Sequence, residues 1–507
     1  MSSRLCANCN LVFTGPQMLK QDLPHHQSRE SITSAANHGC YICGIITKSE
    51  AWKAFDVDDS FKSTWYLEAL SGSLSGWLNL TIDAVGMEAS SSEQSDGSEE
   101  VSGTIEPIET GVLIEQTESG VVQSSPPVPI WGFAIQPAKA FQADVEGNLG
   151  HYTPPKESDH PRILGLGQQW LSKCRAHHPS CNNQNLAFRP TRLLEIVDQN
   201  RGRVILASDE ILNHPYATLS HCWGKGKTLR LMASNIDELR SNINLDELPA
   251  SYREANSICN KFGFQYIWID SLCIIQDSID DWRQEAMAMR DVYRNSTLNI
   301  AAAAASENSD SSFTARDAST ISPLPIDAQW EGQNPGKYYL TNANTYRDEV
   351  ASSPLRRRAW VVQEVWLASR NLYLTKNQLW WKCCEIEASE SYPDGLPEEL
   401  SSRGSLTGFG KQRYGIKGLH HSWNRLVETY SACGLTVPSD KMIAFAGIAQ
   451  HFQTLLGSDV YAAGLWRSQL PQALCWFSTK EVRAFRPPAY RAPTILVLGF
   501  LGWSYSL

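Results

Sequence analysis

Apolar residues between positions 216 and 305 form short continuous runs that are separated by helical stripes. The runs have the length of buried strands, and in the stripes apolar residues recur every three or four positions. The pattern predicts strands at residues 216–222, 266–274 and 297–303, and helices at residues 249–262 and 280–294. Buried strands joined by helices of this length are typical of a parallel sheet that is covered on both faces. We therefore expect an α/β fold with a parallel sheet core.

Polar and aromatic residues stand where the first two of these strands leave the sheet. Ser220 and Trp223 close the first strand, while Asp270 and Ser271 follow the apolar start of the second. Ligands of such sheets bind beyond the carboxyl ends of the strands, so we expect these four residues to border one site. Ser220, Trp223 and Ser271 are candidates for binding a ligand. Asp270 is a candidate catalytic residue, and an anchor of its loop through backbone amides is an equally good interpretation.

Four blocks of sequence between residues 216 and 385 resemble the successive blocks of the fungal heterokaryon incompatibility (HET) domain, in the same order. They read LSHCWG, LPASYREA, YIWIDSLCIIQDSIDDWRQEAMAMRDVY and RRRAWVVQEVWLASRNLYL. The family is associated with non-self recognition and programmed cell death after unlike hyphae fuse. Its core is thought to be related to Toll/interleukin-receptor (TIR) domains, some of which hydrolyse NAD.

The resemblance implies a TIR-like or flavodoxin-like parallel sheet and an effector of vegetative incompatibility, which we expect to be cytoplasmic because the sequence shows no signal peptide and no membrane span. It also implies a protein partner, in recognition or in self-association, and NAD as a substrate. A non-enzymatic signalling module that oligomerises is the rival hypothesis, and an accessory protein of a metabolic pathway is a third.

The resemblance also implies a catalytic carboxylate. In NAD-cleaving TIR domains the functional glutamate sits on a helix soon after a strand end, and Glu285 has a similar place. We expect its carboxylate to be buried and to point toward the strand ends. The alternative is a glutamate on the helix flank that pairs with Arg253 or Arg290. Glu364, in the last block, is the second candidate.

Two cysteines near the strand ends are weaker candidates for a nucleophile. Cys222 and Cys273 would each need a base or a lowered pKa to react. His221 adjoins Cys222, but successive strand residues point to opposite faces of a sheet. We therefore expect both thiols to be buried and structural.

The N-terminal region contains two CxxC pairs with histidines between them. The pairs are Cys6 with Cys9 and Cys40 with Cys43, and the histidines are His25, His26 and His38. Two such pairs suit a tetrahedral zinc site, so the four sulfur atoms should converge, with a histidine as a possible substitute for one of them. Buried thiols beside a helix that runs from Ser31 into Ile46 are the alternative.

A second Cys/His group stands at Cys174, His177, His178 and Cys181. It contains zinc-type ligands, but too few of them are certain to define a site by themselves. We favour the capped end of a helix with partly exposed histidines.

Composition restricts the function further. The formal net charge of −10 does not favour a nucleic-acid partner, which would usually meet a basic face. The first 20 residues lack a continuous apolar segment, and no run of 18 apolar residues exists, so we expect no signal peptide and no membrane span. In a cytoplasmic protein most of the 13 cysteines should be thiols or metal ligands.

Changes in composition along the chain predict five regions. Residues 1–85 form a Cys/His module, residues 86–127 a disordered acidic and Ser-rich insertion, and residues 128–190 a connecting region. Residues 191–390 contain the HET-like segment, and residues 391–507 are expected to be mainly helical. The apolar last residues, TILVLGFLGWSYSL, suggest that the final region is truncated.

Overall fold

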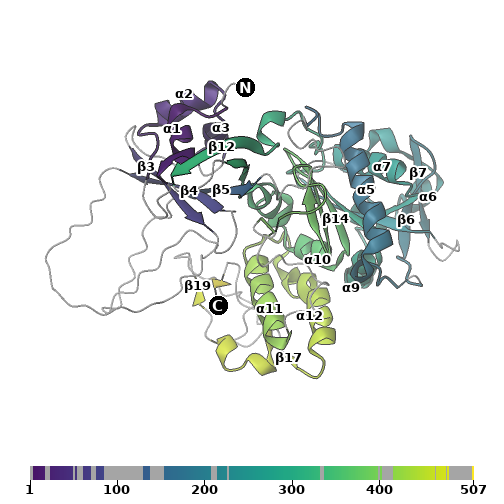
Figure 1. Cartoon of the computed structure of the whole chain (residues 1–507). Coiled ribbons are helices and arrows are strands. Elements are labelled where there is room, and N and C mark those ends of the chain that lie inside the picture. Colours follow the sequence, from purple (N-terminus) through teal and green to yellow (C-terminus); the bar gives the residue numbers. More distant parts are fainter. Residues whose placement is uncertain are drawn as a thin grey trace. The chain divides into compact units, whose positions relative to one another are not determined.

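The computed structural model divides into two compact units (Figure 1). Residues 1–154 and 318–345 form unit 1, and residues 155–317 and 346–507 form unit 2. The structure describes residues 4–16, 23–49, 52–53, 61–69, 76–84, 130–137, 154–185, 187–206, 214–224, 226, 228–331, 336–397, 400–401, 415–462, 464–474, 477–478 and 505–506. The predicted insertion at residues 86–127 lies outside these residues.

Unit 1 is built on a seven-stranded sheet with the order β1-β12-β13-β5-β4-β3-β2. Its strands are β1 (Thr14–Pro16), β2 (Leu23–Pro24), β3 (Phe61–Ala69), β4 (Gly76–Ala84), β5 (Ile130–Pro137), β12 (Leu324–Glu331) and β13 (Gly336–Asn342). All neighbours pair antiparallel except β1 with β12. The sequence boundaries had assigned β12 and β13 to the region that contains the HET-like segment. Here they lie between β1 and β5 and join two early parts of the chain.

Short helices pack on this sheet. They are α1 (Ala7–Asn10), α2 (Arg29–Asn37) and α3 (Tyr41–Lys48), with the helical turn η1 (Leu11–Phe13). A further turn, η6 (Ala318–Thr320), lies beside α3. The single helix expected from Ser31 into Ile46 is wrong, because Gly39 has φ of 87° and separates α2 from α3. Glycine adopts this left-handed conformation at little cost, and it commonly ends a helix.

Unit 2 is built on a nine-stranded mixed sheet with the order β16-β15-β14-β11-β8-β10-β6-β7-β9. Its strands are β6 (Arg192–Ile196), β7 (Arg201–Leu206), β8 (Tyr216–Ser220), β9 (Ile243–Asn244), β10 (Tyr266–Trp268), β11 (Leu298–Ala301), β14 (Arg370–Leu374), β15 (Leu379–Cys383) and β16 (Glu387–Ser389). The predicted parallel pairing is confirmed, because β8 pairs parallel with both β10 and β11, and β11 with β14. The flanking strands are antiparallel, since the short connections of β6 to β7 and of β14 to β15 allow no other arrangement.

The second predicted strand is shorter than expected. β10 ends at Trp268, and Asp270–Cys273 form the short helix α8 instead of continuing the strand to residue 274. A brief apolar run has the same appearance in a buried strand and in a buried helical turn, so periodicity could not separate them.

Helices cover both faces of the sheet of unit 2. On one face α5 (Pro161–His177) and α7 (Ala250–Phe262) share an apolar core with the strands. On the other face the core contains α9 (Ile279–Asn295), α10 (Ala359–Leu367), α11 (Gly415–Ser431) and α12 (Ile443–Leu456). The predicted helices at residues 249–262 and 280–294 are thus confirmed as α7 and α9.

The remaining elements of unit 2 are short. The helices are α6 (Ile236–Ser241), η4 (Pro179–Cys181), η5 (Leu245–Glu247), η7 (Arg347–Ala351), η8 (Leu355–Arg357), η9 (Pro438–Lys441), η10 (Arg467–Gln469) and η11 (Gln472–Leu474). The strand pairs are β17 (Tyr461–Ala462) with β18 (Leu465–Trp466), and β19 (Phe477–Ser478) with β20 (Tyr505–Ser506). None of the described helices is both long and apolar enough to cross a membrane.

Candidate functional sites

The chain leaves β8 and β10 at the same edge of the sheet, and a side-chain contact joins the two exits. The indole nitrogen of Trp223 donates a hydrogen bond to Asp270 Oδ2 at 2.7 Å. The other carboxylate oxygen accepts the backbone N–H of Ser271 at 2.7 Å. The Asp270 side chain keeps 19% of its surface exposed. Three of the residues expected at the strand ends are therefore brought together, around a carboxylate that solvent still reaches.

A buried chain of hydroxyl and imidazole groups lies beside Asp270. The Tyr252 hydroxyl is 2.7 Å from Ser271 Oγ and 3.0 Å from His221 Nε2. Burial lowers the pKa of His221 to about 4, and Arg358 adds to this effect while Asp270, with its Oδ1 3.8 Å away, opposes it. At neutral pH His221 is therefore uncharged, and hydrogen bonds rather than an ion pair hold this part of the site.

Glu364 approaches the same edge from α10 and is almost completely buried. Burial raises the pKa of its carboxyl to about 7, although Arg358 and hydrogen bonds with Ser220 and Tyr293 lower it. Ser220 Oγ also lies 3.2 Å from Asn299 Oδ1 on β11. Near pH 7 this carboxyl group is thus divided between its neutral and its ionised form. It can both donate and accept a proton.

Two arginines border these groups. Arg358 is partly buried and donates a hydrogen bond to the backbone carbonyl of His221. The exposed Arg230 places its guanidinium carbon 5.1 Å from the centre of the Trp223 ring. Two positive charges therefore lie close to the residues that surround the carboxylates. We call Ser220, His221, Trp223, Tyr252, Asp270, Ser271, Tyr293, Arg358 and Glu364 the strand-end cluster.

Residues 216–364 match the family model described as Heterokaryon incompatibility protein (HET). This segment is a HET domain. It begins with β8 and ends at Glu364, so every member of the strand-end cluster lies within it. No curated protein and no solved structure matches the chain.

Glu285 lies in a different part of the HET domain. Its side chain is fully buried, and its Oε1 atom is 3.8 Å from Nη1 of Arg192 on β6. Arg192 in turn binds Asp281 with both terminal nitrogens and donates to the Cys273 carbonyl at 2.7 Å. Burial raises the pKa of Glu285, while Thr191 and Arg192 lower it. The structure therefore buries Glu285, as expected, but beside Arg192 rather than toward Ser220 or Asp270.

The two thiols near the strand ends are buried. Burial raises the pKa of Cys273 to about 12 and also raises that of Cys222, which Arg358 partly offsets. A thiol with a raised pKa holds little of the thiolate that acts as a nucleophile. Both cysteines fit the structural role that was expected.

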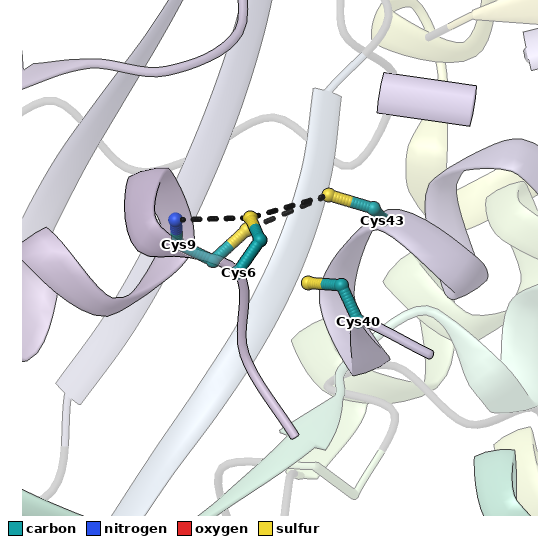
Figure 2. Close-up of side chains that lie close together, drawn as sticks. All are labelled: Cys6, Cys9, Cys40 and Cys43. Atoms are coloured by element: carbon teal, nitrogen blue, oxygen red, sulfur yellow. Dashed lines mark hydrogen bonds between the residues drawn. The ribbon is translucent and has the colours of Figure 1, made fainter. Parts of the chain in front are cut away.

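In unit 1 the sulfur atoms of Cys6, Cys9, Cys40 and Cys43 converge as predicted, all within 4.8 Å of one another. Figure 2 shows the first pair at the start of α1 and the second at the start of α3, with the sulfur atoms facing one another. Cys43 Sγ is 3.6 Å from Cys9 Sγ and 4.0 Å from Cys6 Sγ. Two thiolates on one tetrahedral zinc ion, each at about 2.3 Å, lie about 3.8 Å apart. The donor set therefore fits zinc in both chemistry and spacing.

Two of the three N-terminal histidines adjoin these sulfurs. His25 Nε2 is 3.2 Å from Cys9 Sγ, and His26 Nε2 is 3.4 Å from both Cys6 Sγ and Cys43 Sγ. Burial lowers the pKa of His25 to about 3, so its imidazole is neutral, as a metal ligand must be. His38 is exposed and its ring bonds to the Ser34 carbonyl, away from the sulfurs.

The sequence did not assign Tyr252, Tyr293 or Asn299 to the site. The two tyrosines occupied apolar stripe positions, where an aromatic ring is usually a core residue. Tyr252 stands in the first turn of α7, which lies between β8 and β10 in the chain, and its hydroxyl contacts His221 and Ser271 at the strand ends. A tyrosine on the buried stripe, in the first turn of a helix, was the signal in the sequence.

Proposed function

We propose that this chain is a cytoplasmic HET-domain effector of fungal non-self recognition and programmed cell death, and that its strand-end cluster cleaves the nicotinamide glycosidic bond of NAD. The observation that carries the proposal is Glu364, a buried carboxyl group with a pKa of about 7 at the ligand-binding edge of the sheet. A protein partner, or a second copy of the chain, is proposed to switch the activity on.

The order of the parallel strands supports this location. The four parallel strands follow one another along the chain as β8, β10, β11 and β14. In the sheet they stand side by side as β10-β8-β11-β14, which is the order 2-1-3-4 of flavodoxin-like sheets. In such sheets the ligand binds where the strand order reverses, between the first and third strands. Here these are β8 and β11, and Ser220 is the last residue of β8. A TIR-like core is part of the proposal.

The proposed cleavage of NAD needs only a few groups in the strand-end cluster. When the bond between ribose and nicotinamide breaks, its electron pair leaves with the ring, and the ribose acquires oxocarbenium character. An ionised carboxylate stabilises that charge, and water then adds to the ribose carbon and gives up a proton. Glu364 is proposed as the carboxylate and proton acceptor. Asp270 is proposed to bind the ribose hydroxyls, and Trp223 and Ser271 to hold the ligand beside it.

Glu285, the first candidate in the sequence, is proposed to support this site from a distance. Its contact with Arg192 stabilises the packing of α9 against β6. This role predicts effects on folding rather than on the chemical step.

The test is release of nicotinamide from NAD by the purified full chain. Glu364→Gln keeps the size of the side chain and removes its charge, and it should lower the rate about a hundredfold or more. Asp270→Asn should weaken NAD binding, while Glu285→Gln should change the rate of the folded protein less than about tenfold. Glu157→Gln, at an exposed position, is the control.

The rival hypothesis makes the opposite prediction in cells. If Glu364→Gln kills cells as efficiently as the parent at equal expression, and neither lowers NAD, the enzyme hypothesis is wrong. The domain would then signal by association alone.

We further propose that the N-terminal thiolates bind a structural zinc ion. Four protein ligands would leave no open coordination position, so the ion would stabilise unit 1 rather than act on a substrate.

A further inference from the structure

A second group of metal-type ligands gathers in unit 2. Cys174 lies in the last turns of α5, His178 is the C-cap of that helix, and Cys181 ends η4. The structure adds Cys383, the last residue of β15. The four ligand atoms lie within 4.8 Å of one another. The sequence showed only the first three ligands side by side, because the fourth comes from a distant part of the chain.

The geometry of this group fits a tetrahedral ion. Cys383 Sγ is 3.4 Å from His178 Nδ1. A sulfur and an imidazole nitrogen bound to one zinc ion lie about 3.6 Å apart. The three cysteines are buried, and the histidine is partly exposed. Three thiolates with one imidazole are a common ligand set of structural zinc.

Arg370 gives a separate reason to expect thiolates here. Its side chain is almost fully buried, and its Nε donates to Cys174 Sγ at 3.1 Å. Its other acceptors among the described residues are the Thr297 carbonyl and the Asn182 side chain, and neither is charged. A guanidinium is always ionised, and burying its charge is costly unless an anion lies beside it. A metal-bound thiolate at Cys174 supplies that anion.

The sulfur of Cys383 has a similar contact with the backbone. The N–H of Ile386 donates to Cys383 Sγ at 3.4 Å, three residues further along the chain. In unit 1 the N–H of Cys9 donates to Cys6 Sγ at 3.5 Å with the same spacing. Both contacts place a hydrogen-bond donor on a sulfur atom, which stabilises its ionised form.

We propose that Cys174, His178, Cys181 and Cys383 bind one structural zinc ion, at a second metal site separate from that of unit 1. With four protein ligands the site is closed, so its role is to fasten the end of α5 to the end of β15. All four ligands lie outside the matched HET segment at residues 216–364. The ion would therefore hold together two segments that flank the domain on either side in sequence.

The first test is the zinc content of the full chain, purified under reducing conditions without chelator. Cys181→Ser and Cys383→Ser should each lower it by one equivalent per chain. The matched control is Cys384→Ser, because this neighbouring thiol contacts the Ser369 carbonyl and Cys181 but is not one of the four ligands. His178→Cys should keep the ion and His178→Ala should lose it. Equal zinc content in Cys383→Ser and Cys384→Ser would overturn the proposal.

A second test uses the unchanged protein, so it stands even if the variants do not fold. Alkylation of Cys174, Cys181 and Cys383 is followed by mass spectrometry, with and without a zinc chelator. The chelator should speed their labelling at least about tenfold, whereas Cys259, which is fully buried in the apolar core, should label slowly in both cases. Identical labelling of the three ligands in both conditions would show that no metal protects them.

Discussion

At the scale of single residues, two glutamates of the HET domain show how the surroundings decide what a carboxyl group can do. Glu285 and Glu364 are both buried, and burial raises the pKa of each. Glu285 meets Thr191 and Arg192 near β6, whereas Glu364 meets Arg358, Ser220 and Tyr293 at the strand ends. The sequence placed both on helices, but it could not show which strand each helix faces. Which strand a helix faces depends on the order of the strands in the sheet, and no local sequence pattern encodes this order.

The raised pKa of Glu364 predicts a dependence of stability on pH. Its pKa is about 7 in the folded protein, against 4.5 for an ordinary glutamate side chain, so folding favours the protonated form. The contribution of this raised pKa to the free energy of unfolding is complete below about pH 4.5 and is lost as the pH rises through 7. The shift corresponds to about 3 kcal/mol at most.

Glu364→Gln cannot ionise, so it should remove this part of the pH dependence. We expect the free energy of unfolding of the variant, relative to that of the parent, to rise by up to about 3 kcal/mol between pH 5 and pH 8. Denaturant unfolding at the two pH values measures this difference. Glu157→Gln is exposed and should follow the parent at both values. If the free energy of unfolding changed equally with pH in Glu364→Gln and in the parent, the raised pKa of Glu364 would be contradicted.

At the scale of elements, local sequence was a good guide wherever one pattern continued for several residues. The strands β8 and β11 and the helices α7 and α9 were predicted close to their observed bounds. Errors arose in short segments, where one residue decides the outcome. Gly39 divided an expected helix, and the turn at Asp270 replaced half of an expected strand.

The end of α7 gives a prediction at this scale. Gly263 follows the helix with φ of 79°, a conformation that L-residues adopt at a cost, although nothing lies within 4 Å of an added Cβ. Gly263→Ala should therefore destabilise the protein by about 1 kcal/mol in denaturant unfolding. Gly165, inside α5, also has open space around it.

Gly165→Ala is the matched control, because alanine is the better residue inside a helix. It should stabilise the protein, by up to about 1 kcal/mol. The two substitutions add the same methyl group, so an equal sign for both would mean that backbone conformation is not what decides the effect.

At the scale of the whole molecule, the chain uses distant segments to complete local structures. The N-terminal cysteine cluster was predictable because its members come as two closely spaced pairs, and the structure brings the pairs together. The fourth member of the Cys/His group in unit 2 was not predictable, since Cys383 is far from Cys181 in sequence. Residues 318–345 likewise join the sheet of unit 1, which the sequence did not indicate because strand patterns do not say which sheet a strand joins.

The zinc site proposed in unit 1 predicts the effect of removing one of its ligands. Cys9→Ser should lower the zinc content of the full chain by at least one equivalent and lower its thermal midpoint by about 5 °C or more. His38→Ala should change neither, because this histidine lies away from the sulfurs. Elemental analysis and calorimetry of the two variants make the comparison, and zinc loss in His38→Ala would show that the ligand set is different.

The sheet of unit 1 has a consequence for synthesis on the ribosome. β12 and β13 stand between β1 and β5, so this sheet is incomplete until residue 342 has emerged. The chain between β5 and β12 contains most of the HET domain. At about 5–20 residues per second, the first strands wait roughly ten seconds or longer for their partners. During that time the edge of β5 is unpaired, and a nascent chain of this protein is most exposed to wrong strand pairing, and most in need of a chaperone, before its last third is made.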